Sequence, residues 1–333
     1  MTKYTKHFRD SVWGEIKVSK LACSIIDTFE FQRLHHIKQT GLAYKVFPTA
    51  TSSRFEHSIG VYHVTKLIIE SVERDMSCSE KLSVRKKELI AIIGLLHDIG
   101  HGPLSHLFDD FLQGQENVSI PSTHEERSCV LFRKMVEREN LDFSEEEVEW
   151  ITTRILCPPN EHWYDTLVCN PYSSFDTDKI DYLRRDCKHF GIIINFDWDR
   201  ILQNMRVIDN KLCFCEKIYQ EIENVFILRE QMHSSIYRHP TIEKFQNFLL
   251  KYMKTNPSYF IIPTMDDFVK WNDVSIFFHL PFQVWKEMEC RSWKGFHDIQ
   301  QNIKYSDHQR QNAMKNTLWY KRSEPNVFFH KQL

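Results

Sequence analysis

The sequence predicts a mostly α-helical protein that carries small β-hairpin attachments. Apolar residues recur at spacings of three and four along most of the chain, which is the period of a helix with one buried face. Only 9 of the 333 residues are glycine and 11 are proline, so positions that break helices are sparse. Segments with the composition of strands are few and short.

Four apolar stripes mark expected helices, because residues three and four apart share one helical face. In chain order they are Leu21, Ile25, Ile26 and Phe29; Val61, Val64, Leu67 and Ile68; Leu89, Ile92, Ile93 and Leu96; and Ile222, Val225, Phe226 and Arg229. Three segments predict strands: Ala43 to Phe47, Lys211 to Cys215 after the turn signal Asp209-Asn210, and Tyr259 to Ile262. We expect one large domain over residues 1–250 and a less regular C-terminal extension over 251–333 that packs on it.

Composition and charge exclude several classes of protein. The 43 Lys and Arg against 45 Asp and Glu leave a net charge of −2, so no basic excess favours nucleic acid. The longest apolar run, Leu89 to Leu96, is too short to span a bilayer. The 9 cysteines form no CxxC pair, which suits a reducing interior and predicts a cytoplasmic or nuclear protein without a membrane anchor.

Three segments among the 17 histidines combine imidazoles with carboxylates. They are Arg54-Phe55-Glu56-His57-Ser58-Ile59-Gly60, Leu95-Leu96-His97-Asp98-Ile99-Gly100-His101-Gly102-Pro103 and Asp176-Thr177-Asp178-Lys179-Ile180-Asp181-Tyr182. Alone, His97-Asp98 reads as a polar pair at the end of a helix, and Asp178 as a helix cap. Together, His57, His97, Asp98 and Asp178 supply a donor set that suits Zn, Fe or Mn.

This His…His-Asp…Asp order is similar to that of the HD superfamily of metal-dependent phosphohydrolases. Further segments resemble the deoxynucleoside triphosphate triphosphohydrolases, most of all the vertebrate branch that joins a SAM domain to an HD domain. They include Asp27-Thr28 with Phe31-Gln32-Arg33-Leu34, Val46-Phe47-Pro48, His101-Gly102-Pro103-Leu104-Ser105-His106 with Asp109, Thr123-His124-Glu125, and Arg185-Asp186-Cys187. The resemblance covers about residues 4–250 and implies an HD-superfamily catalytic domain over 1–250, no SAM domain, and a shortened C-terminal extension over 251–333.

The resemblance implies roles for the residues around the metal set. His124 matches a catalytic histidine that acts as general acid, and Asp109 matches the carboxylate that orients it. Arg54 would bind the α-phosphate, His101 and His106 match further active-site histidines, and Mg would accompany the nucleotide phosphates. The implied reaction converts a dNTP to deoxynucleoside and triphosphate, with water attacking the α-phosphorus.

The substrate residues divide into those that spacing places together and those that only the resemblance implies. Lys179, Tyr182 and Asp186 share one helical face beside Asp178, although a core helix could equally bury Tyr182. The resemblance implies that Lys179 meets phosphate, Tyr182 stacks and Asp186 meets the 3′-hydroxyl. It adds, in the same way, Gln39 for the 3′-hydroxyl, Arg229 for the γ-phosphate, Tyr237 against the sugar, Thr40 where the family has Leu, and Arg238 where it has Gln.

The resemblance also implies a regulatory guanine-nucleotide site and a homo-oligomer, dimer or tetramer. The matching positions are Lys6, Asp27, Gln32, Arg206 and Lys217. Because His35 and Cys215 stand where the family has Arg, two charge-assisted phosphate contacts are missing, and we expect activation to be weak or absent. Two other functions stay open: an HD-type nuclease or cyclic-nucleotide phosphodiesterase, and a non-catalytic nucleotide sensor.

Overall fold

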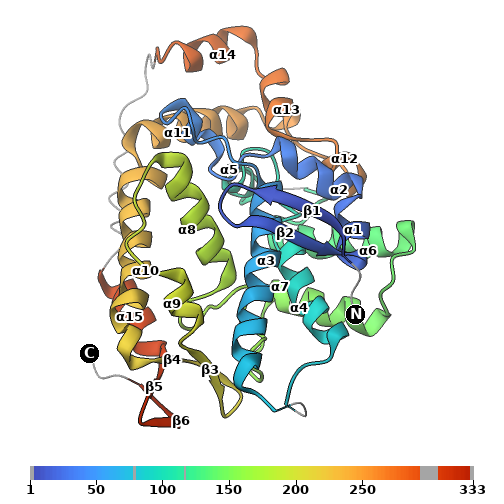
Figure 1. Ribbon diagram of the computed structural model, residues 1–333. Helices are drawn as coiled ribbons and strands as arrows, with labels where there is room; N and C mark the ends of the chain where they lie inside the picture. The colour runs from blue at the N-terminus through green and yellow to red at the C-terminus, as the bar shows by residue number, and fades with distance from the viewer. Residues whose placement is uncertain (1–3, 78–79, 116–117, 293–306, 331–333) are drawn as a thin grey trace.

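The computed structural model describes residues 4–77, 80–115, 118–292 and 307–330, and these residues are mostly helical (Figure 1). The α-helices are α1 Lys20–Ile26, α2 Phe29–Gln32, α3 Arg54–Val72, α4 Val84–Leu96, α5 His106–Leu112, α6 His124–Glu139, α7 Glu145–Leu156, α8 Thr177–Phe190, α9 Trp198–Leu202, α10 Tyr219–Met232, α11 Pro240–Thr255, α12 Met265–Phe268, α13 Asp273–Phe278, α14 Phe282–Glu289 and α15 Asp307–Asn316. Short 3₁₀ turns span Arg33–His36, Gly41–Lys45, Glu73–Asp75, Glu216–Ile218 and Pro257–Tyr259, and a π-turn spans His233–Tyr237. The predicted fold class is confirmed, and three of the four predicted stripes each lie within one helix, α3, α4 or α10. The first stripe is confirmed only from Leu21 to Ile26 in α1, because Phe29 begins α2 and is 61% exposed.

The strands form two small sheets. Strands β1 (Tyr4–Asp10) and β2 (Gly14–Ser19) make an antiparallel hairpin. Strands β3 (Met205–Ile208), β4 (Lys211–Cys215), β5 (Leu318–Lys321) and β6 (Glu324–His330) make a second sheet in the order β3-β4-β5-β6. Because β4 pairs in parallel with β5, the end of the described chain joins a sheet that begins near residue 205.

One of the three predicted strands is confirmed, Lys211 to Cys215, and two are wrong. The segment from Ala43 to Phe47 lies mostly in a 3₁₀ turn, where the amide of Val46 donates to the carbonyl of Ala43 at 3.0 Å. The segment from Tyr259 to Ile262 begins at the last residue of the 3₁₀ turn Pro257–Tyr259 and belongs to neither of the two sheets of the described residues. Short apolar runs are ambiguous because they can be buried without a strand partner. The β1–β2 hairpin was missed because polar residues dominate both strands.

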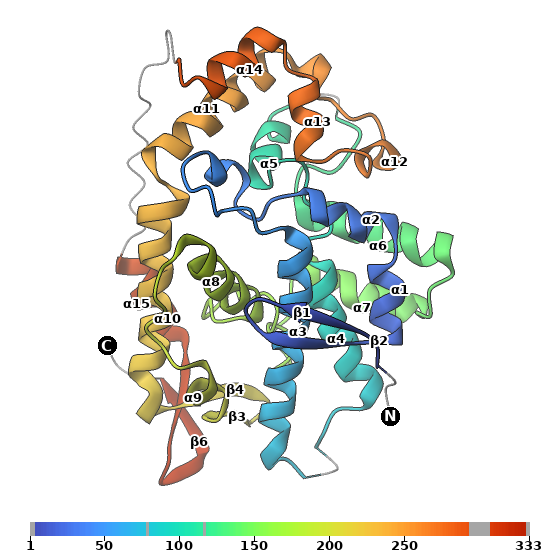
Figure 2. The ribbon, with the colours of Figure 1, turned by 45° about the horizontal axis from the view of Figure 1, so that its top comes forward.

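Helices α3, α4 and α8 form the centre of the molecule (Figures 1 and 2). Helix α4 is buried without a break from Glu88 to Leu96, so it has no solvent-facing side over that stretch. Helices α3 and α8 pack closely at Gly60, where an added Cβ would lie 1.9 Å from a carboxylate oxygen of Asp181. Only glycine therefore fits at this crossing, which fixes α8 against α3.

Hydroxyl and carboxylate caps set the start of the helices that carry the candidate site. Ser53 caps α3, Thr123 caps α6 and Asp176 caps α8, each accepting from a backbone amide of the first turn. His57, His124 and Asp178 therefore lie within the first helical turn or directly after it. Within the described ranges, every helix is too short or too polar to cross a membrane.

The C-terminal part contributes α11 to α15 and strands β5 and β6. Helix α11 runs from Pro240 to Thr255 and so crosses the predicted division at residue 250. The division into residues 1–250 and 251–333 stays a prediction.

Candidate active site

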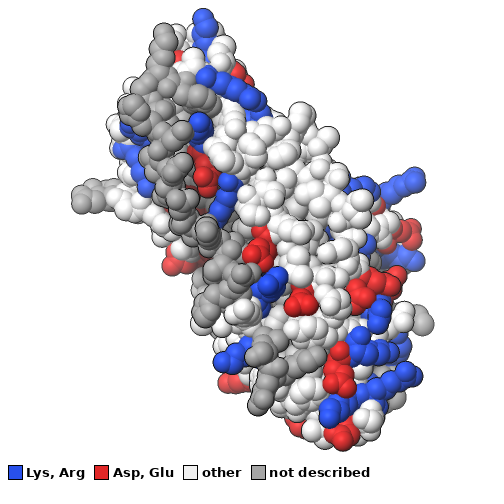
Figure 3. All heavy atoms as spheres, turned by 90° about the vertical axis from the view of Figure 1, so that its left-hand side faces the viewer, with Lys and Arg blue, Asp and Glu red and all other residues white. Residues whose placement is uncertain are grey.

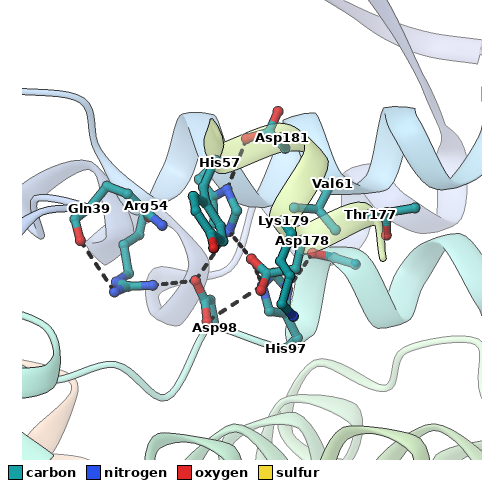
Figure 4. A network of polar contacts seen from close by, with 12 residues as sticks. Gln39, Arg54, His57, Val61, His97, Asp98, Thr177, Asp178, Lys179 and Asp181 are labelled. Atoms are coloured by element: carbon teal, nitrogen blue, oxygen red, sulfur yellow. Dashed lines mark hydrogen bonds and ion pairs between the residues drawn. The ribbon is translucent and has the colours of Figure 1, made fainter. Parts of the chain in front are cut away.

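Three helices bring the predicted metal donors together. His57 comes from α3, His97 and Asp98 follow α4, and Asp178 comes from α8 (Figure 4). Donor atoms of His57, His97 and Asp98 all lie within 4.8 Å of one another. Asp178 Oδ1 lies 3.1 Å from His57 Nε2 and 3.7 Å from His97 Nε2. Four residues that span more than 120 positions of sequence therefore converge on one point.

Each histidine of this donor set is held by its Nδ1 atom, so its Nε2 atom faces the cluster. His57 Nδ1 lies 2.8 Å from a carboxylate oxygen of Asp181, and His97 Nδ1 lies 2.9 Å from the carbonyl of Gly94. Both Nε2 atoms are buried and have no hydrogen-bond partner among the described residues. Buried polar atoms without partners are costly. A cation bound between them would satisfy both, so the residues present fit a metal.

The electrostatics of the donor set also favour positive charge. Burial acts to lower the pKa of His57, but the neighbouring carboxylates of Asp178 and Asp181 outweigh burial and raise that pKa to about 10. Burial acts to raise the pKa of Asp98, yet the neighbouring Arg54 guanidinium and two imidazoles hold it well below its usual range. The carboxylates therefore stay ionised and create a negative, buried site suited to a cation.

A second histidine cluster lies directly beside the first and comprises His101, His106, Asp109 and His124. The rings of His101 and His124 stack with centroids 3.8 Å apart. His101 Nε2 lies 3.3 Å from Asp98 Oδ1, which links the two groups. The His106 ring makes T-shaped contacts with the rings of His101 and His124, and its side chain is 71% exposed.

His124 is oriented by a carboxylate that is itself anchored. His124 Nδ1 lies 2.8 Å from Asp109 Oδ2, and the buried Arg127 pairs with the other oxygen of Asp109. Burial acts to raise the pKa of Asp109, but hydrogen bonds with His106 and His124 and the charge of Arg127 hold it far below its usual range. Asp109 is therefore a carboxylate that holds the His124 ring through Nδ1, and the other ring nitrogen, Nε2, lies 3.3 Å from Glu125 Oε1.

A turn after α4 carries His97, Asp98 and His101, and side chains from elsewhere hold it. Arg33 donates to the carbonyls of Ile99 and His101 at 2.8 and 2.9 Å. Arg127 donates to the carbonyl of Gly100 at 2.8 Å. These bonds satisfy backbone carbonyl groups of the turn, which lie beyond the last helical residue and have no helical partner.

A cavity of about 390 Å³ opens beside Asp178. Its walls include ten of the residues predicted from the sequence: Gln39, Thr40, Arg54, His106, Asp178, Lys179, Tyr182, Asp186, Arg229 and Tyr237. The cavity contains three cationic side chains, from Arg54, Lys179 and Arg229, and two carboxylates. A small ligand that carries negative charge at one end fits this distribution.

Several polar atoms of the cavity wall are buried and lack a partner among the described residues. They are Gln39 Oε1, Thr40 Oγ1 and Asp186 Oδ1. The second oxygen of Asp186 accepts from the hydroxyl of Tyr237 at 2.7 Å. Burial raises the pKa of Asp186 to about 6. Because unsatisfied buried polar atoms are rare, these three indicate the position of ligand groups that can form hydrogen bonds.

Some predicted residues lie elsewhere. Arg238 follows the π-turn and is not among the residues that line the cavity. Lys6 pairs with Asp27, and Gln32 donates to the carbonyl of Ile26 at 2.8 Å, so three of the predicted regulatory residues are neighbours. Arg206 lies on β3, 5.6 Å from the ring of Tyr320, and Lys217 lies in the 3₁₀ turn after β4. Figures 1 and 2 show β3 and β4 apart from β1, the strand that carries Lys6.

The sequence interpretation missed four residues at the site. Asp181 orients His57, and its position one helical turn after Asp178 could have identified it. Ser105 holds Arg54 by accepting from its Nε at 2.9 Å. His233 and Gln246 line the cavity from the segments before and within α11, where no motif distinguishes them.

Comparison with known proteins agrees with this geometry. Residues 54–164 match the HD domain family, and this stretch contains His57, His97, Asp98, His101, His106, Asp109 and His124. The chain is an HD-domain protein. It is a homologue of the deoxynucleoside triphosphate triphosphohydrolases, which confirms the family resemblance in the sequence.

Three relatives illustrate this homology. The chain is 37% identical over 297 residues to an HD domain-containing protein of Acanthamoeba polyphaga mimivirus, covering 83% of this chain and 64% of that protein. It is 33% identical over 241 residues to the deoxynucleoside triphosphate triphosphohydrolase SAMHD1 homolog of Dictyostelium discoideum, covering 71% and 46%. It is 32% identical over 262 residues to the deoxynucleoside triphosphate triphosphohydrolase SAMHD1 of Homo sapiens, covering 70% and 42%. The chain therefore spans about half the length of these relatives.

Proposed function

We propose that this HD-domain protein is a metal-dependent hydrolase that converts a dNTP to deoxynucleoside and inorganic triphosphate. One observation carries the proposal. A set of four metal donors adjoins a cavity that has cationic side chains and unpartnered polar atoms. The names of two relatives, deoxynucleoside triphosphate triphosphohydrolases, support the same substrate class.

The metal would be held by His57, His97, Asp98 and Asp178. Imidazole and carboxylate ligands suit Fe, Zn or Mn, and Mg would accompany the phosphates of the nucleotide. A metal there would polarise a phosphate oxygen and lower the pKa of a bound water. Asp181 and the carbonyl of Gly94 keep the two imidazoles aimed at the site.

The residues of the second cluster would supply the proton that the leaving 5′-oxygen takes up. Water attacks the α-phosphorus, the bond from phosphorus to the 5′-oxygen breaks, and the leaving oxygen takes a proton. We assign that proton to His124 Nε2, because Asp109 holds Nδ1 and stabilises the protonated ring. His101 stacks on His124 and links it to Asp98, while His106 borders the cavity.

The cavity would bind the substrate by its two ends. Arg54 would bind the α-phosphate, and Lys179 and Arg229 would bind the outer phosphates. The 3′-hydroxyl would donate to one of the two unpartnered oxygens, Asp186 Oδ1 or Gln39 Oε1. Tyr182 and Tyr237 would pack against the sugar, with their ring centroids 6.3 Å apart in a T-shaped arrangement. Thr40 is smaller than the Leu of the family, so selection against ribonucleotides would depend mainly on Tyr237.

Regulation by a guanine nucleotide is the part of the resemblance that we expect to be weakest here. His35 stacks on Phe55 at 3.6 Å, and Cys215 is buried in β4, so neither offers the positive charge of an arginine. GTP or a non-hydrolysable dGTP analogue should raise turnover by less than about tenfold. A larger rise together with tetramer formation would contradict this expectation.

Two other functions share the same donors. A nuclease needs a surface that binds a polyanion, whereas the chain has a net charge of −2 and the described part of the face in Figure 3 shows acidic side chains near the basic ones and no broad basic area. A nucleotide sensor needs the cavity but not the anchored His124 and Asp109 pair. Both functions therefore rank behind dNTP hydrolysis.

One assay separates the three functions. The purified protein is incubated with dNTPs, NTPs, a cyclic nucleotide or single-stranded RNA in Mn or Mg, and the products are separated by chromatography. Triphosphate with deoxynucleoside supports the proposal, mononucleotides support a nuclease or phosphodiesterase, and binding without products supports a sensor. His36→Ala, at an exposed histidine, serves as the unaffected control.

A further inference from the structure

A buried carboxylate from the C-terminal part of the chain lies behind the candidate active site. Asp273 is the first residue of α13 and is 2% exposed. Its Oδ1 accepts from the backbone amide of Leu104 at 2.7 Å, and its Oδ2 accepts from the backbone amide of Lys38 at 2.9 Å. One side chain thus joins two loops that are far apart in sequence, and Figures 1 and 2 show α13 beside α5, which follows one of them.

Both loops shape the cavity and hold Arg54. The first loop continues from Lys38 into Gln39 and Thr40, which line the cavity, and the carbonyl of Gln39 lies 3.4 Å from Arg54 Nη2. The second loop continues from Leu104 into Ser105, whose hydroxyl accepts from Arg54 Nε at 2.9 Å. The same hydroxyl donates to the carbonyl of Lys38 at 2.7 Å, which ties the loops to each other.

The second loop has a backbone that needs an external restraint. Leu104 and Ser105 have φ values of 61° and 60°, in the left-handed region that residues other than glycine rarely occupy. Such a conformation is unfavourable for residues other than glycine and persists only where the surroundings fix it. Asp273 provides the restraint, because its carboxylate accepts the amide of Leu104 at the start of the strained pair.

We propose that Asp273 is a positioning residue that sets the orientation of Arg54 and the shape of the cavity wall by joining these two loops. The role of Arg54 in phosphate binding rests on the function proposed above, whereas the junction itself does not. Asp273 lies outside residues 54–164, so the C-terminal part would complete the site that the HD domain begins.

Two substitutions test the junction, and both are compared with an exposed aspartate. Asp273→Asn keeps the shape but replaces one acceptor oxygen with an amide donor that opposes a backbone N–H. Asp273→Ser leaves one small hydroxyl in place of two acceptor oxygens. The control is Asp266→Asn on α12, where the side chain is 76% exposed and pairs with Lys134 at the surface.

The first readout is amide hydrogen exchange, which needs no activity. In the wild type, the backbone amides of Lys38 and Leu104 should be protected from exchange. In either Asp273 variant these amides should exchange at least about tenfold faster, whereas in Asp266→Asn they should exchange at the wild-type rate. Fast exchange of both amides in the wild type would overturn the proposal even if neither variant folds.

The second readout is kinetic, with melting temperature measured in parallel. In a folded variant, kcat/KM for a dNTP should fall by about tenfold, chiefly through a higher KM, while the bound metal stays at the wild-type level. A lower melting temperature with unchanged KM and unchanged exchange would mean that Asp273 only stabilises the fold. A wild type that releases no triphosphate would refute the proposed function, and the exchange data would still decide the role of Asp273.

Discussion

The two histidine clusters of this protein lie side by side but differ in burial and anchoring. In the first, His57 and His97 are each fixed through Nδ1, and their Nε2 atoms converge without partners. In the second, His101 and His124 stack on each other and His106 is largely exposed. The first cluster has converging donors, whereas the second has one anchored ring, His124, and one exposed ring, His106, which lines the cavity.

This difference separates two chemical tasks. A buried set of fixed donors suits an ion that stays bound, because removing the ion would leave unpaired buried atoms. A ring held by one carboxylate can gain and lose a proton without losing its orientation, as His124 is held by Asp109. Substitutions in the two clusters should therefore fail in different ways.

The largest effect should follow from removing a donor of the first cluster. His97→Ala leaves three donors and should release the metal, so activity falls by about a thousandfold or more. Metal content by mass spectrometry and triphosphate release measure the two losses together. The control His36→Ala should change neither the metal content nor the activity. If the His97→Ala protein kept its metal, the first cluster would not be the metal site and the two clusters would not differ in task.

A smaller loss of a different kind should follow from substitution in the second cluster. His124→Ala should keep the metal and lower kcat by about 10²–10⁴-fold, because a general acid is lost while the donors stay. Metal content and steady-state kinetics distinguish this outcome from the first. If His124→Ala also lost its metal, the two clusters would be one site.

The orienting carboxylate should have an intermediate effect on the metal. Asp181→Asn keeps the volume but weakens the bond that fixes the His57 ring, so metal affinity should fall by about 10–100-fold. Competition with a chelator measures that affinity. An unchanged affinity would show that packing alone orients His57.

The smallest effect should come from Asp186, a carboxyl group of the cavity wall whose pKa is shifted upward, in contrast to those of the carboxylates in the two clusters. The pKa values of Asp98 and Asp109 lie below the usual range, whereas burial raises that of Asp186 to about 6. The folded protein then holds a proton that the unfolded chain has released, so this group lowers stability as pH rises from about 4 to 6. Asp186→Asn removes this loss and keeps an acceptor for the hydroxyl of Tyr237.

Urea unfolding at pH 5 and pH 8 measures the effect of Asp186. Relative to the wild type, Asp186→Asn should gain on the order of 2–3 kcal/mol of unfolding free energy at pH 8 and about half as much at pH 5. Asp199→Asn, at an exposed aspartate of α9, should show no such difference. A gain that is the same at both values of pH would contradict the raised pKa.

Sequence patterns predicted where several helices lie and which residues form the candidate site, but by different kinds of evidence. Apolar spacing identified α1, α3, α4 and α10 because each of these helices buries residues three and four apart. The motifs supplied the residues that converge around His57, because the resemblance ties distant segments to one arrangement. The roles of these residues stay predictions, including those of Arg238 and of the five proposed regulatory positions.

Contacts that depend on the folded chain could not be predicted in this way. The bonds from Asp273 to Leu104 and Lys38 cross 169 and 235 positions of sequence, and no local pattern encodes them. Ala43 to Phe47 has a strand-like composition, but hydrogen bonds to residues three positions back satisfy its backbone as a 3₁₀ turn. These local hydrogen bonds take the place of the sheet partner that the composition predicts.

Helix α8 has a further consequence for how the site can change. Asp178, Lys179, Tyr182 and Asp186 all project from this one helix toward the cavity, over about 12 Å of helix axis. A helix behaves as a stiff rod, so a small tilt moves all four side chains together. The tight crossing at Gly60 is the pivot of that rod, and a bulkier residue there would displace the metal end and the sugar end in a single motion.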